Sequence, residues 1–115
     1  MKYHVHCIRK DDYNIEFDEN IWTEEEIEKW GEVFFDTDLE GLAEHLSFLI
    51  MRFGENQFYE GFGYVKKYDK DGKFIPQYKF FGADYKEVPE EDYANGVKLH
   101  VVSHEEEYEF EVTKV

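Results

Sequence analysis

Several features common in small proteins are scarce in this chain. It has one cysteine, Cys7, so no disulfide can form within the chain, and cysteine usage gives no sign of an oxidising compartment. Its longest apolar run covers residues 46–51, with Ser47 inside it, and is far too short to span a membrane. The first residues lack the pattern of a signal peptide. We therefore expect a cytoplasmic protein with no membrane partner.

Basic residues are almost missing from one third of the chain. Between Asp11 and Glu44, fourteen acidic residues accompany a single basic one, Lys29. This segment contributes most of the formal net charge of −15. Such a charge repels phosphate and attracts basic surfaces before any contact forms. It argues against direct nucleic-acid binding and favours a basic protein partner.

The acidity does not indicate disorder. Hydrophobic residues make up 42% of the chain and aromatic residues 19%, which is more apolar surface than acidic disordered segments possess. A chain of 115 residues is close to the commonest domain size. We therefore expect a single folded domain over residues 1–115.

Alternation of apolar and polar residues predicts several strands. Residues 3–8 and 13–17 alternate on either side of Asp11-Asp12, which predicts a first hairpin with Cys7 on its buried, apolar side. Residues 58–68 and 73–81 flank the turn sequence Asp69-Lys70-Asp71-Gly72 and predict a second hairpin. Residues 97–102 and 108–115 predict a third.

Two capping boxes predict two helices between these hairpins. Thr23 with Glu26 begins a helix that Gly31 and the β-favouring residues Val33-Phe34-Phe35 should end early, and Thr37 with Glu40 begins a longer one. Apolar residues recur at helical spacing from Leu39 to Phe53, and a glycine follows at position 54. The sequence thus predicts an α+β fold. Its antiparallel sheet has about five or six strands, in the order β-hairpin, short helix, long helix and β-hairpins, and the helices pack on one face.

Acidic side chains on a strand face and on a helix surface are the candidate partner-binding residues. Acidic side chains that alternate along a strand lie about 6.5–7 Å apart, close to the spacing of every second phosphate on a DNA strand, about 7 Å. The last predicted strand carries such a row. The complete candidate set is Glu16, Asp18, Glu19, Glu24, Glu25, Glu28, Glu32, Glu107, Glu109 and Glu111.

Histidines offer an alternative site. His4 and His6 lie on the same face of the first predicted strand, a spacing that suits a metal ligand pair. If that strand pairs with the strand around Leu99, His100 could join them in a metal-binding or small-molecule site. The other interpretation is that all three are outward-facing polar residues.

The chain carries no recognisable catalytic or cofactor motif. No set of residues fills the roles of nucleophile, base and transition-state stabiliser, so we expect a protein that is not an enzyme and has no cofactor. In size and acidity the chain resembles small inhibitors from phages and mobile elements that imitate DNA. The sequence therefore predicts a non-enzymatic binding module that engages a basic protein surface, such as that of a nucleic-acid-binding protein.

Overall fold

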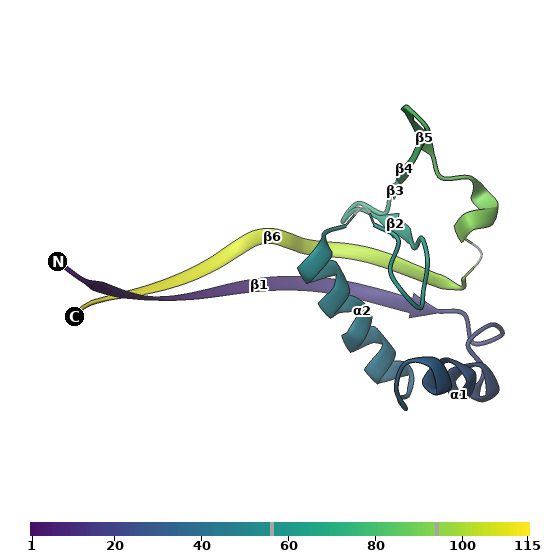
Figure 1. Cartoon of the computed structure of the whole chain (residues 1–115), viewed down its shortest axis with the longest axis horizontal. Coiled ribbons are helices and arrows are strands. Elements are labelled where there is room, and N and C mark those ends of the chain that lie inside the picture. Colours follow the sequence, from purple (N-terminus) through teal and green to yellow (C-terminus); the bar gives the residue numbers. More distant parts are fainter. Residues whose placement is uncertain (56, 94) are drawn as a thin grey trace.

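In the residues that the structure describes, two α-helices and six strands form the fold (Figure 1). The structure is a computed structural model that describes residues 1–55, 57–93 and 95–115. The elements in chain order are β1 (Tyr3–Phe17), α1 (Glu24–Val33), α2 (Leu39–Phe53), β2 (Lys66–Tyr68), β3 (Phe74–Ile75), β4 (Tyr78–Phe81), β5 (Asp84–Glu87), the 3₁₀ helix η1 (Glu90–Tyr93) and β6 (Val97–Lys114). The α+β class predicted from the sequence is confirmed.

The strands form two sheets, which corrects the predicted single antiparallel sheet of five or six strands. A four-stranded sheet has the order β1-β6-β2-β3, and β4 pairs with β5 in a separate two-stranded sheet. The larger sheet is mixed. Strands β2 and β6 are parallel, whereas β1 and β6, and β2 and β3, are antiparallel. Strand order and direction depend on contacts between distant residues, which local alternation does not encode.

Residues 3–17 and 97–115, all of them described, do not form the first and third predicted hairpins. β1 continues through Asp11-Asp12, β6 continues through residues 103–107, and the two long strands pair with each other. The two segments predicted as turns lie opposite one another and form an irregularity in the ladder. There the Asp11 carboxylate accepts a hydrogen bond of 2.8 Å from the backbone N–H of Glu105, which has a positive φ of 58°. Turn-like residues therefore make a β-bulge here rather than a chain reversal.

The second predicted hairpin is present, but its strands are short. Asp69 organises the turn between β2 and β3, since its carboxylate accepts hydrogen bonds of 2.9 Å from the N–H groups of Asp71 and Lys73. β3 ends at Ile75, directly before Pro76, which has no N–H for a ladder. The later hairpin of β4 and β5 was not anticipated.

Both helices begin and end close to the predicted residues, although α1 continues through Gly31 to Val33. The Thr23 hydroxyl accepts a hydrogen bond of 3.2 Å from the N–H of Glu26, as the capping box predicts. Helix α2 is capped by Asp38, whose carboxylate accepts from Gly41 at 2.8 Å, and the prediction of Thr37 as its cap is wrong. Gly54 ends α2 with a φ of 95°, in the left-handed region that glycine enters at little cost.

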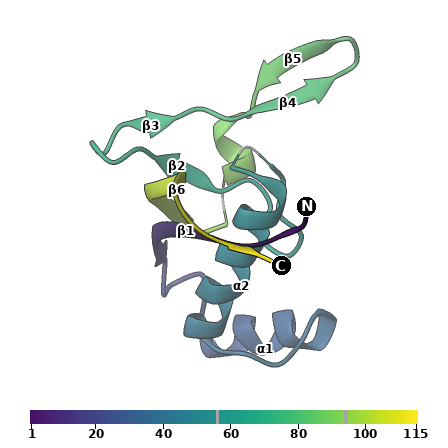
Figure 2. The same ribbon diagram turned by 90° about the vertical axis from the view of Figure 1, so that its left-hand side faces the viewer.

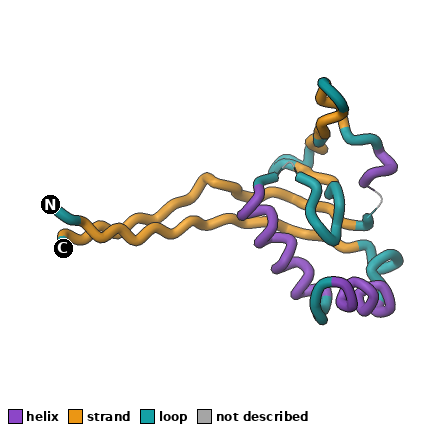
Figure 3. The backbone as a smooth tube through the Cα atoms, in the orientation of Figure 1, coloured by secondary structure: helices purple, strands orange, loops and turns teal. Residues whose placement is uncertain are grey.

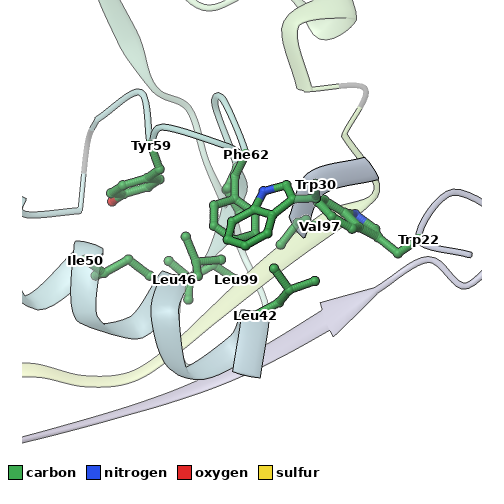
Figure 4. Close-up of a cluster of buried hydrophobic side chains, with 10 residues drawn as sticks. Trp22, Trp30, Leu42, Leu46, Ile50, Tyr59, Phe62, Val97 and Leu99 are labelled. Carbon is green, nitrogen blue, oxygen red and sulfur yellow. The ribbon is translucent and has the colours of Figure 1, made fainter. Parts of the chain in front are cut away.

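The hydrophobic core lies between α2, the loop before β2 and the part of the β1–β6 ladder formed by residues 13–17 and 97–101 (Figure 4). We call this packed part of the molecule the body. Helix α2 runs across this sheet face, whereas α1 lies at its end and contributes Trp30 (Figures 1 and 2). The prediction that both helices cover the sheet face is therefore corrected for α1. The buried cluster consists of Trp22, Trp30, Leu42, Leu46, Ile50, Tyr59, Phe62, Val65, Val97 and Leu99.

A two-stranded ribbon projects from the body, and both chain ends lie at the tip of this ribbon (Figure 3). We call it the arm and define it as residues 3–10 of β1 paired with residues 107–114 of β6. The arm makes the molecule 55 Å long. It also raises the radius of gyration to 17.3 Å, against roughly 13 Å for a compact chain of this length. In the described residues, neither helix is long and apolar enough to cross a membrane.

The arm has one apolar and one polar face. Directly opposed residues of an antiparallel pair share a face, and Cys7 is opposite Phe110. The apolar face carries Tyr3, Val5, Cys7, Tyr108, Phe110 and Val112, with Arg9 and Lys114 at its two ends. Cys7 is exposed, which corrects the expectation of a buried thiol, because no helix covers this part of the ribbon (Figure 1).

Candidate functional site

The ten predicted partner-binding acids fall into two separate groups. Three lie on the polar face of the arm, and the other seven lie at the opposite end of the molecule, on or near α1. Glu107 is nine residues along β6 from Lys98, the partner of Glu16, which corresponds to roughly 30 Å along a strand. The acids therefore form two surfaces that a partner could recognise independently.

The arm group is partly neutralised by its neighbours. Glu107, Glu109 and Glu111 lie on one face, where they oppose Lys10, Ile8 and His6 respectively. Lys10 Nζ is 2.6 Å from Glu109 Oε1, and this ion pair is exposed. The Glu109 charge is thus paired within the arm, and the row carries less free charge than its sequence suggests.

Helix α1 presents a row of three exposed acids. Glu24, Glu28 and Glu32 are spaced by four residues and are exposed, so they lie on one side of the helix about 5–6 Å apart at their Cβ atoms. The only base of the helix, Lys29, contacts Glu25 at 3.6 Å and Glu26 at 3.4 Å instead. Among the described residues, no cation lies within 4.0 Å of the three acids of this row.

The remaining acids lie between β1 and α1. Glu16 is opposite Lys98, and its carboxylate is 3.2 Å from Nε2 of His100. The Asp18 carboxylate accepts a hydrogen bond of 2.9 Å from the N–H of Asn20, which is an ordinary turn contact. Glu19 is exposed and adjoins this turn. Glu16 and Asp18 also line a hollow of about 570 Å³ beside Lys66 and Lys98.

The three predicted histidine ligands do not come together. His4 and His6 lie on the polar face of the arm, whereas His100 lies in the body opposite Asn14 and stacks on Tyr68 with ring centres 5.1 Å apart. Eight residues of β1 separate His6 from Asn14, or roughly 26 Å. The strands pair as the metal-site hypothesis requires, but their register keeps the ligands apart. In the part of the chain that the structure describes, no group of three His, Cys, Asp or Glu residues is arranged to hold a metal ion.

Sequence reasoning missed a polar cluster where the arm joins the body. The Asp11 side chain is fully buried and pairs with Arg9 at 2.8 Å, and the Tyr13 hydroxyl hydrogen-bonds Nδ1 of His104. Nearby, Lys67 Nζ contacts Glu55 Oε2 at 2.9 Å. Burial raises the pKa of Tyr13 to about 12, and the Asp11 charge adds to this effect. Alternation gave no signal for the cluster, because its members come from β1, β2, β6 and the segment just after α2.

Asp11 is expected to make the bulge sensitive to acid. Burial alone would raise the pKa of Asp11, but the Glu105 N–H and the Arg9 guanidinium outweigh burial and hold this pKa below its usual value. A lowered pKa in the folded state stabilises the fold above the unfolded-state pKa of about 3.9, and this stability is lost as the pH falls through the folded-state pKa. Below about pH 4, protonation of Asp11 should weaken its hydrogen bond to the Glu105 N–H. Hydrogen exchange of the Glu105 amide should then slow down less with falling pH than the intrinsic base-catalysed exchange rate does.

Hydrogen exchange of the Glu105 amide, measured from neutral pH downward by NMR, checks this expectation. Asp11→Asn is the matched control, since it removes the titrating carboxylate and should abolish the acid-dependent step. Protection of Glu105 that stays constant through the acid range in the unsubstituted protein would contradict the assignment.

Comparisons with protein-family models, with curated proteins and with solved structures give no match for this chain.

Proposed function

We propose that this protein is a non-enzymatic binding module whose acidic α1 surface engages a basic surface of a protein partner. The observation that carries the proposal is the row formed by Glu24, Glu28 and Glu32, which is exposed and has no cation in contact among the described residues. A basic partner would supply the missing counter-charges. The partner class that fits best is a nucleic-acid-binding protein, on which the row occupies the place of a phosphate backbone.

Folding alone accounts for only part of this row. Glu24 lies in the first turn of α1, where an acid interacts favourably with the helix dipole. Glu32 lies in the last turn, which contains no basic residue, and an acid there opposes the dipole. Glu28 and Glu32 also repel each other at a spacing of four residues. Two of the three carboxylates therefore weaken the helix slightly, so helix stability does not explain their presence.

Three lysines between residues 66 and 79, the most basic part of the chain, are paired with acids. Lys66 contacts Glu90 at 2.6 Å, Lys67 contacts Glu55 at 2.9 Å, and Lys79 contacts Asp92 at 2.6 Å. Their charges are therefore largely compensated within the protein, and an overall charge of −15 disfavours the approach of phosphate. These pairs support a protein partner over nucleic acid.

Two triple variants with equal charge changes test which acidic surface binds. One replaces Glu24, Glu28 and Glu32 by Gln, and the other replaces Glu107, Glu109 and Glu111 by Gln. Partners are captured from a native lysate, eluted with a salt gradient and then purified for affinity measurement. We expect the α1 variant to lose about tenfold or more in affinity and to show a shallower salt dependence, because it removes three exposed charges from the contact. The arm variant should bind nearly as well as the unsubstituted protein.

Competition with nucleic acid tests the class of partner. If this protein imitates phosphates, it binds to the nucleic-acid site of its partner. The partner should then release bound DNA or RNA as the protein is added. Equal losses in both triple variants would indicate a general charge effect and contradict the assignment to α1. A captured partner that binds nucleic acid and this protein simultaneously would contradict the mimicry.

A further inference from the structure

The arm is a two-stranded ribbon with solvent on both faces. Residues 3–10 and 107–114 pair only with each other, and α2 ends before the ribbon leaves the body (Figures 1 and 3). An isolated two-stranded ribbon is marginally stable in water, and stable ribbons usually have one face covered. The question is what covers the arm.

The uncovered surface is apolar and lies on the same side of the sheet as the core. Tyr3, Val5, Tyr108, Phe110 and Val112 keep between 49% and 64% of their surfaces exposed. Together with Cys7 they expose on the order of 600 Å², given that a large aromatic side chain can bury about 150–250 Å². This area is at the upper limit of the largest apolar patch on a typical monomer.

Arg9 shows on which side of the sheet this face lies. It shares the apolar face with Tyr108, and its Nη1 donates a hydrogen bond of 3.4 Å to the backbone carbonyl of Met51 near the end of α2. The apolar face of the arm therefore extends the face that α2 covers in the body. A second layer on the arm would continue the layer that α2 begins.

We propose that this layer is the arm of a second copy, so that the protein forms a twofold-symmetric dimer in which two arms pack face to face. Two such faces bury on the order of 1,200 Å² in total, which reaches the lower end of the range for specific interfaces. The interface belongs to a reversible dimer. It goes beyond the proposed partner binding, since the α1 row lies on the body and stays free.

The distribution of charge favours a second copy with antiparallel arms. Residues 1–10 and 105–115 carry four bases and five acids, a net charge of −1, whereas residues 11–104 carry nine bases and 23 acids, a net charge of −14. Arms can therefore approach each other with little repulsion, but bodies cannot. Antiparallel arms place the two bodies at opposite ends of the dimer.

A twofold axis through the middle of the arm also pairs opposite charges. Cys7 and Phe110 oppose each other at this middle. Lys114 and Glu106 each lie four residues from Phe110, in opposite directions. With antiparallel arms crossing there, Lys114 of each copy lies over position 106 of the other. The same arrangement stacks Phe110 on its symmetry mate at the centre, where hot-spot residues concentrate.

Sedimentation equilibrium on the full chain without tags tests the dimer. We expect a monomer–dimer equilibrium in the unsubstituted protein. Phe110→Glu should weaken dimerisation on the order of 100-fold or more, because it places an unpaired carboxylate in the centre of an apolar contact. Thr113→Glu is the matched control: it adds the same charge to the same strand but on the polar face, and it should leave the dimer nearly unchanged. Circular dichroism verifies that both variants are folded.

A charge exchange tests the antiparallel arrangement. Glu106→Lys and Lys114→Glu should each weaken the dimer several-fold, and the double variant should recover most of the loss, since it restores the pair in reversed order. A protein that stays monomeric up to about 100 µM, where interfaces of this size associate, would overturn the proposal. So would a dimer that Phe110→Glu leaves intact, or a monomer whose apolar face is covered by another protein.

Discussion

Replacing Trp30 by Ala is expected to lower the free energy of unfolding by about 3–5 kcal/mol, the range for removal of a buried large aromatic side chain. Trp30 is buried at the junction of α1 with the rest of the core (Figure 4). Its ring contacts those of Phe34 and Phe62, with centres 4.6 and 5.8 Å apart. Its indole N–H donates a hydrogen bond of 3.0 Å to the Gly61 carbonyl. The substitution therefore removes the main contact that holds α1 against the loop before β2.

Urea denaturation monitored by far-ultraviolet circular dichroism measures this change, and Val33→Ala is the control. Val33 lies on the same helix but is largely exposed, so its truncation should change stability by no more than about 0.5 kcal/mol. Trp30→Phe should fall between the two, since it keeps a ring but loses the N–H donor. A loss below about 1 kcal/mol for Trp30→Ala would contradict the packing described for α1.

Asn95→Asp is expected to cost about 2–4 kcal/mol, although the two side chains have the same shape, because the donors of two partly buried hydrogen bonds are lost and a charge is introduced. The Asn95 amide NH₂ donates hydrogen bonds to the carbonyls of Phe62, at 2.8 Å, and Tyr64. Its own backbone carbonyl accepts from the Trp22 indole at 2.7 Å. One residue thus connects the loop before β2, the start of β6 and the segment before α1. In the variant, a carboxylate would face two carbonyl oxygens and repel both.

Thermal and urea unfolding of Asn95→Asp beside Asn20→Asp test this prediction. Asn20 is exposed, so the control makes the same chemical change without a buried contact, and its effect should stay within about 0.5 kcal/mol. Similar stabilities for the two variants would show that the Asn95 amide is not needed to hold the loop.

Local signals in the sequence predicted the helices well because they act within one turn. The Thr23 cap, the apolar stripe of α2 and Gly54 at its end need no distant partner, and the turn at Asp69 is equally local. The long strands could not be predicted in this way. Asp11-Asp12 and residues 103–107 have turn-like composition, and only their position opposite each other makes them a bulge.

The acidic residues of the candidate surfaces could be named from the sequence, but their arrangement in space could not. Alternation correctly placed Glu107, Glu109 and Glu111 on one strand face. It could not show that Lys10 neutralises part of that row, or that Glu28 and Glu32 lie at the far end of the molecule, because both follow from the pairing of β1 with β6. The polar cluster around Asp11 was missed for the same reason.

The bulge between arm and body divides β6 into two segments. Odd-numbered residues of β6 face the core side in the body, whereas even-numbered residues lie on that side in the arm. On β1, Tyr13 is three residues after Lys10, whereas on β6 their partners Val101 and Glu107 are six residues apart. β6 therefore contains three extra residues here. Because this number is odd, Leu99 and Phe110 lie on the same side. Because strand faces alternate with every residue, an insertion or deletion of one residue in this segment would exchange the two faces of the β6 half of the arm. Related sequences can therefore vary in length here only by even numbers of residues if the arm is to keep its apolar side aligned with the core.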